Sequence, residues 1–119
     1  MPTTTEHGSY TQVTSDIVTV ATTITLDGID VIKPHCFAGV QFFTDGTGGT
    51  PATPGAGTVT ITVKTINSTP IFEAVPSNVI DATDIGTVSF ASNTTSVRAL
   101  PAGVTTATHY RMVVTCNLT

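Results

Sequence analysis

The strongest pattern in the sequence is a strict alternation of apolar and polar residues. In residues 57–67, GTVTITVKTIN, the apolar residues Val59, Ile61 and Val63 alternate with threonines and one lysine. A period of two places the apolar side chains on one face of a pleated strand and the polar ones on the other. A further isoleucine falls on the polar positions, so we expect a bulge or the strand end near Thr65.

The last residues of the chain repeat this pattern. The segment 108–118 reads THYRMVVTCNL, and its polar face carries His109 and Arg111. The opposite face is predicted to be buried and holds Tyr110, Met112, Val114, Cys116 and Leu118. Further strands are predicted at residues 16–26, 36–44, 85–92 and 96–100, with shorter pieces at 29–32, 71–73 and 79–80.

Turn-forming residues separate these segments. Thr, Val and Ile make up 50 of the 119 residues, and branching at Cβ favours strands over helices. The turns are expected at Asp27-Gly28, Lys33-Pro34, Thr69-Pro70, residues 75–78 and residues 101–103. Seven to nine short strands without an amphipathic helix predict an all-β fold, a single-domain antiparallel β-sandwich or jelly roll spanning residues 1–119.

Two segments carry almost no side chains able to enter a core. The stretch 44–57, TDGTGGTPATPGAG, lies between two strong strands and is longer than a usual hairpin loop. Residues 1–12 form a polar, Thr-rich arm at the amino end. We expect a flexible N-terminal arm and a projecting loop that become ordered on a partner; a mobile surface loop is the simpler alternative for 44–57.

Charge and hydropathy exclude several classes of function. The formal net charge is −4, and the four basic residues are dispersed, so neither a phosphate-binding face nor nucleic-acid binding is expected. No run of 18 apolar residues is present, which argues against a membrane span. The first residues lack the pattern of a secretory signal, so synthesis in a host cytoplasm is expected. The basic residues are Lys33, Lys64, Arg98 and Arg111.

The chemistry-bearing residues show no catalytic or metal-binding pattern. His7, His35 and His109 lack the spacing of a zinc site, and the Asp pairs near residues 27–30 and 81–84 are typical of turns. We therefore expect no enzyme activity, catalytic residue, metal or cofactor. Cys36 and Cys116 lie in apolar runs and are expected to be buried reduced thiols; a disulfide stays open, because an early strand and the last strand could be neighbours.

Several of these features occur together in one known family. An acidic, Thr/Val/Ile-rich β-protein with the arm MPTTTEHGSYTQVTSD, the loop at 44–57 and the ending VVTCNLT resembles the small decoration, or cement, proteins of tailed bacteriophage heads. The resemblance implies a sandwich or jelly roll on the outer surface of the virion, bound to the major capsid protein at capsomer junctions. It also implies a homo-oligomer, with arms that are ordered against the shell or a sister subunit.

The candidate partner-binding residues lie at the roots of the two extensions and within the loop. Tyr10, Phe42 and Phe43 are predicted as aromatic anchors. One of the two adjacent phenylalanines must point away from the core, because neighbouring strand residues face opposite sides. That outward ring alternatively forms a second layer on a two-sided strand. The loop contributes Thr47, Pro51 and Pro54.

Two other functions fit the same features. A structural subunit of a phage tail or fibre would assemble into tubes or trimers without a capsid. A carbohydrate-binding head module would need an aromatic platform, and seven aromatic residues without tryptophan supply one poorly.

Overall fold

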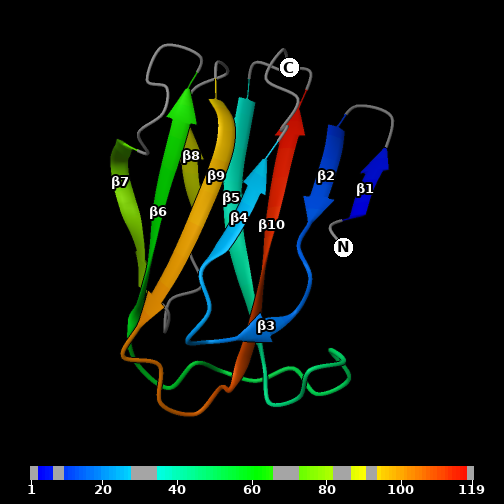
Figure 1. Ribbon diagram of the computed structural model, residues 1–119, viewed down its shortest axis with the longest axis vertical. Helices are drawn as coiled ribbons and strands as arrows, with labels where there is room; N and C mark the ends of the chain where they lie inside the picture. The colour runs from blue at the N-terminus through cyan, green and yellow to red at the C-terminus, as the bar shows by residue number, and fades with distance from the viewer. Residues whose placement is uncertain are drawn as a thin grey trace.

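The computed structural model describes residues 3–6, 10–27, 35–65, 73–81, 87–90 and 94–117. Every regular element in these ranges is a β-strand (Figure 1). The strands are β1 (Thr3–Glu6), β2 (Tyr10–Thr14), β3 (Val18–Thr19), β4 (Ile24–Asp27), β5 (His35–Phe43), β6 (Thr58–Thr65), β7 (Glu73–Asp81), β8 (Thr87–Phe90), β9 (Thr94–Ala102) and β10 (His109–Asn117).

The strands form two antiparallel sheets that face each other. The six-stranded sheet has the order β1-β2-β10-β5-β8, with β3 also paired to β10, and the four-stranded sheet has the order β4-β9-β6-β7. The hydrogen-bonded pairs β2–β10, β4–β9, β5–β8 and β6–β7 are nested along the chain, each inside the one before. This nesting is the jelly-roll arrangement, so the predicted all-β fold is confirmed.

The core lies between the two sheets and is built from alternate residues of their central strands. On β10, Tyr110, Met112 and Val114 are fully buried, as the period of two predicts. On β6, Val59 and Ile61 face them from the second sheet with no exposed surface. The same cluster includes Ile24, Leu26, Cys36, Ala38, Val40, Phe42, Val63, Val97, Ala99, Ala107 and Cys116.

β6 and its neighbours β7 and β9 contain residues that the sequence predicts as a bulge or as turns. The pairing of β6 with β9 shifts register between Lys64 and Thr65, where a bulge is predicted. Residues 75–78, predicted as a turn, instead lie within β7, but they have no register partner in β6. β9 likewise continues through Pro101, which is paired with Val59, and ends at Ala102, so the turn predicted at 101–103 begins only at Gly103, where φ is 75°.

The predicted strand at 16–26 is wrong, because the chain changes sheets within it. β3 belongs to the six-stranded sheet and β4 to the other, and a turn closed by Thr22 N to Thr19 O at 3.0 Å separates them. Val18, Val20, Ile24 and Leu26 all fall on even positions, so the alternation continues across the turn and gives no sign of it.

The amino end also differs from expectation. β1 and β2 extend the six-stranded sheet instead of forming a free arm; Thr4 is paired with Val13, and Val13 with Val114 of β10. The ladder of backbone hydrogen bonds orders these residues without a partner. The segments predicted at 29–32, Lys33-Pro34 and Thr69-Pro70, together with Leu118, lie outside the described residues.

Candidate docking surface

The loop 44–57 runs across one end of the sandwich and is held there by its own chain (Figure 1). Past its midpoint, Ala52 N donates to Phe42 O at 2.9 Å. Near its end, the carbonyl of Pro54 accepts hydrogen bonds from the backbone amides of Thr105 and Thr106, both at 3.1 Å. The expectation that the loop projects and is ordered only by a partner is therefore corrected, because these bonds offset the entropy of ordering it.

Asp45 fixes the turn at the beginning of the loop. Its carboxylate accepts hydrogen bonds from the Thr47 hydroxyl, from Gly49 N at 3.2 Å and from Thr50 N at 3.1 Å. The Thr47 hydroxyl contributes most to holding the pKa of Asp45 below its usual value, desolvation opposes it, and the backbone amides add to the lowering. The charged form of Asp45 is thus the one that orders this turn.

The adjacent rings of Phe42 and Phe43 point to opposite sides of β5, as predicted. Phe42 enters the core, where its ring centroid lies 6.2 Å from that of Tyr110. Phe43 is also buried, but on the outer side, where Pro51 of the loop pairs with it in an isolated β-bridge. The Arg111 guanidinium carbon lies 5.3 Å from the Phe43 ring centroid, within cation–π range.

A cavity of about 340 Å³ opens beside Phe43. Arg111 Nε donates to Gln41 Oε1 at 2.6 Å on one side of it. The lining thus combines one cation and an amide with an otherwise apolar wall, which suits binding rather than acid–base chemistry. The remaining lining residues are Val40, Phe42, Phe43, Gly48, Pro51, Ala52 and Pro54.

The structure gathers most of the predicted partner-binding residues at this end of the sandwich. Phe42, Phe43 and Pro54 are buried, so they do not present apolar surface to a partner in this conformation, while Thr47 and Pro51 are exposed. The sixth residue, Tyr10, is half-buried on β2, where it is paired with Asn117. Sequence reasoning missed Gln41 and Arg111, because the register that pairs them across β5 and β10 is tertiary information.

The outer face of the six-stranded sheet carries a second, uncharged surface. Five neighbouring side chains on β2, β10 and β5 face away from the core, and we call this group the outer patch. Thr115 of β10 is paired with Gln12 of β2 on one side and with Phe37 of β5 on the other. Gln12 Nε2 donates a hydrogen bond to Thr115 Oγ1 at 3.3 Å. Two residues before Thr115 on β10, Val113 faces the same side and is paired with Thr14 of β2. The outer patch is therefore Gln12, Thr14, Phe37, Val113 and Thr115, with most of its members half-buried.

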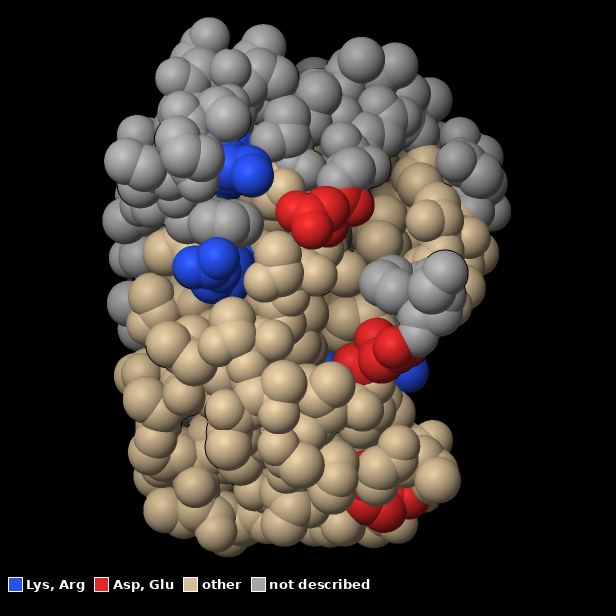
Figure 2. All heavy atoms as spheres, in the orientation of Figure 1, with Lys and Arg blue, Asp and Glu red and all other residues tan. Residues whose placement is uncertain are grey.

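The outer face of the four-stranded sheet is different in kind. Among the described side chains, Leu100 of β9 is the exposed large hydrophobic residue, with 48% of its surface accessible. Its outward neighbours in register include Thr60 of β6. Figure 2 shows the charged groups of this side as few and separated, with broad uncharged surface between them.

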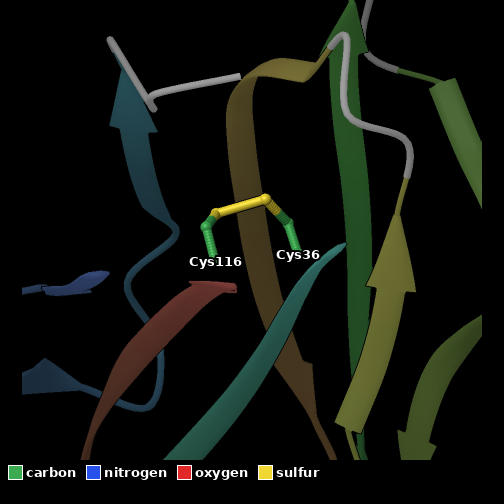
Figure 3. Close-up of a disulfide and its surroundings, with 2 residues drawn as sticks. All are labelled: Cys36 and Cys116. Atoms are coloured by element: carbon green, nitrogen blue, oxygen red, sulfur yellow. A yellow bond between two sulfur atoms is a disulfide. The ribbon is translucent and has the colours of Figure 1, made fainter. Parts of the chain in front are cut away.

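Cys36 and Cys116 form a disulfide, which corrects the expectation of reduced thiols. The two residues are direct register partners on β5 and β10, with Cα atoms 4.1 Å apart, and both side chains are buried in the core. Figure 3 shows the bond crossing between the adjacent strands. The alternative left open by the sequence is the one observed, since the early and last strands are indeed neighbours.

The described residues hold neither a metal-binding cluster nor a membrane-spanning helix. No group of three His, Cys, Asp or Glu side chains in these ranges is placed to hold a metal ion. Within the same ranges, no helix has the length and apolar character needed to cross a membrane.

The nested strand pairs and the two-sheet core define a jelly-roll β-sandwich protein. Residues 8–119 match the family described as a domain of unknown function, DUF7265, and the chain belongs to that family. The match covers β2 to β10 and leaves out β1. In a comparison with curated proteins, no match was found. Among solved structures, a chain from a study of Bacillus endospore appendages, described as a novel family of disulfide-linked pili, shares 18% identity with a TM-score of 0.41, over 100% of this chain and 92% of its own.

Proposed function

We propose that the protein is a structural subunit that docks on a larger protein assembly, and more narrowly a decoration protein on the outer surface of a phage capsid. The observation that carries the proposal is the outer patch on β2, β10 and β5. It is a continuous row of uncharged side chains on three adjacent strands of the six-stranded sheet, half-buried except for Thr115, which is buried.

Such a surface is well suited to contact with another protein. Desolvating hydroxyl and amide groups costs much less than desolvating carboxylates or ammonium groups, and the hydroxyls can exchange water for hydrogen bonds with a partner. Phe37 and Val113 add apolar area within the same patch. Many copies on one shell would sum small interface energies into a stable coat.

The charge of the chain suits the outer side of a capsid. With a formal net charge of −4, the protein would be repelled by packaged DNA, so the lumen of the shell is the less favourable location. The partner in this proposal is the major capsid protein, and the location is the virion surface after synthesis in a host cytoplasm.

Sedimentation with undecorated, expanded capsids tests the proposal. The wild type is expected to co-sediment saturably, and Val113→Asp in the outer patch is expected to abolish binding. Thr25→Asp, on the exposed outer face of β4, is the matched control and should leave binding intact. Circular dichroism of both variants checks the fold. Failure of the wild type to co-sediment, or equal binding by both variants, would contradict the proposal.

A subunit of a phage tail or fibre is the second candidate. The observation favouring it is the edge strand β1, whose outer side has no sheet partner among the described residues. Such a subunit would form tubes or oligomers in purified form without any capsid. A carbohydrate-binding role has less support, because Phe42 and Phe43 are buried and offer no stacking platform.

A further inference from the structure

β1 is bound to the rest of the molecule by one edge only. In the described part of the chain it pairs with β2 and no other strand, in the register Thr3–Thr14, Thr4–Val13, Thr5–Gln12 and Glu6–Thr11. The side chains of Thr3, Thr4 and Thr5 are all exposed. β1 therefore rests on backbone hydrogen bonds, with little side-chain burial to hold it.

β2 is anchored much more firmly. It is paired with β10 over five residues, Thr11 is buried, and Val13 packs against the core. Just after β2, Ser15 N donates to Met112 O, and Met112 N donates to Ser15 Oγ, both at 2.9 Å. The edge of β2 is thus a fixed template, while the strand lying on it is weakly held.

The position of β1 in the molecule supports this distinction. Figure 1 shows β1 and β2 at the side of the sandwich, beyond β4, with no strand of the four-stranded sheet drawn over β1. The family match begins at residue 8, so β1 lies outside the matched residues and β2 is the first strand within them.

We propose that the edge of β2 is a strand-addition site and that its occupant in assemblies is β1 of a second copy of this chain. The structure shows that this sequence fits the site, because β1 occupies it within one chain in a defined register. Exchange between copies replaces each intramolecular hydrogen bond with the same bond to a neighbour, so the balance depends on concentration and geometry.

The length of the connection restricts how the copies are arranged. Three residues separate Glu6 from Tyr10, and a chain of that length spans at most about 14 Å between these two positions. Exchanging copies would therefore lie side by side at their β2 edges. Reciprocal exchange gives a dimer, and one-way exchange gives an open chain. This inference goes beyond the proposed function, since it requires no capsid.

Pairs of full-chain variants, each with one cysteine added to the native disulfide, test the exchange. Thr5→Cys is mixed with Gln12→Cys carried on a chain of different mass, and the mixture is oxidised at high protein concentration. Thr5 and Gln12 are register partners on the outer face of the sheet, away from the buried native disulfide. A covalent heterodimer is expected, and its yield should rise with concentration.

The matched control replaces Thr5→Cys with Thr4→Cys. Thr4 pairs with Val13 on the opposite face, so its thiol cannot reach position 12 in this register, and no heterodimer is expected. Circular dichroism and the melting temperature confirm that all three variants fold. Absence of heterodimer in the first mixture, equal heterodimer in both, or homodimers of Thr5→Cys alone would overturn the proposal. Loss of capsid binding with exchange intact would contradict only the proposed function.

Discussion

Tyr110 brings a hydroxyl group into the centre of the core and provides it with partners. The Tyr110 hydroxyl lies 2.6 Å from Thr22 O and 3.2 Å from Ala99 O, so it links β10 to the turn before β4 and to β9. The alternation of residues predicts that Tyr110 is buried. It cannot predict the two carbonyl partners, which come from the other sheet and the connection leading to it.

Tyr110→Phe is expected to lower the free energy of unfolding by about 1 kcal/mol. The ring still fills the core, but the part-buried carbonyl of Thr22 and the buried carbonyl of Ala99 lose the neighbouring hydroxyl group. Urea denaturation of the wild type and the variant measures the difference. Equal midpoints would show that the hydroxyl contributes nothing to stability.

The same residue makes stability depend on pH in the alkaline range. Burial raises the pKa of Tyr110 to about 12, a backbone hydrogen bond with Ile24 acting in the opposite direction. Because the folded pKa is above the ordinary value of 10, the contribution is complete below pH 10 and is lost as pH rises towards 12. Melting temperatures from pH 9 to 12 should therefore fall, and they should fall less steeply for Tyr110→Phe.

Asp45 is expected to control local order rather than global stability. In Asp45→Ala, the amides of Gly49 and Thr50 lose their acceptor and should exchange with solvent faster, with little change in melting temperature. Because the folded pKa of Asp45 is lowered, protection of these amides should persist above the usual value of 3.8 and disappear as pH falls through the folded pKa. Asp16→Ala, an exposed position outside the loop, is the control for hydrogen exchange.

At the scale of elements, the strands with alternating residues were the most predictable. β6 and β10 lie where the period of two indicates, and the register shift near Thr65 coincides with the break in that period. The strand at 16–26 was wrong because alternation records which face is buried and not which sheet the strand joins. Proline at 76 and 101 signalled turns, yet both positions lie within strands.

The start of β6 depends on a glycine. Gly57 has a φ of 100°, and a Cβ there would meet the backbone oxygen of Ala102 and lie 2.6 Å from the carbonyl carbon of Gly103. These backbone atoms cannot move aside, so Gly57→Ala should cost at least about 2 kcal/mol of stability. Gly49→Ala is the matched control, because its φ is not positive and its nearest neighbour would be 3.4 Å away; it should change stability by less than about 0.5 kcal/mol. Thermal denaturation compares the two.

At the scale of the whole molecule, the disulfide joins strands that are far apart in sequence. Cys36 and Cys116 are separated by 80 residues, so the bond strongly lowers the conformational entropy of the unfolded chain. The loop-closure relation gives about 4.5 kcal/mol for a loop of this size. Denaturation with and without reductant should show a loss of that order, and the double variant Cys36→Ala/Cys116→Ala should no longer respond to reductant. A reductant-insensitive wild type would contradict this prediction.

The sequence by itself determined the all-β class, the buried faces of β6 and β10, and the opposite orientation of Phe42 and Phe43. These follow from local geometry, because branching at Cβ and a period of two act within a single strand. The tertiary structure alone decided the pairing of Cys36 with Cys116, the docking of the loop 44–57, the position of Arg111 beside Phe43 and the place of β1 at the sheet edge. Each of these depends on which distant strands become neighbours and in which register. The alternation of apolar and polar residues within one strand cannot determine this, because it is the same whichever strand lies beside it.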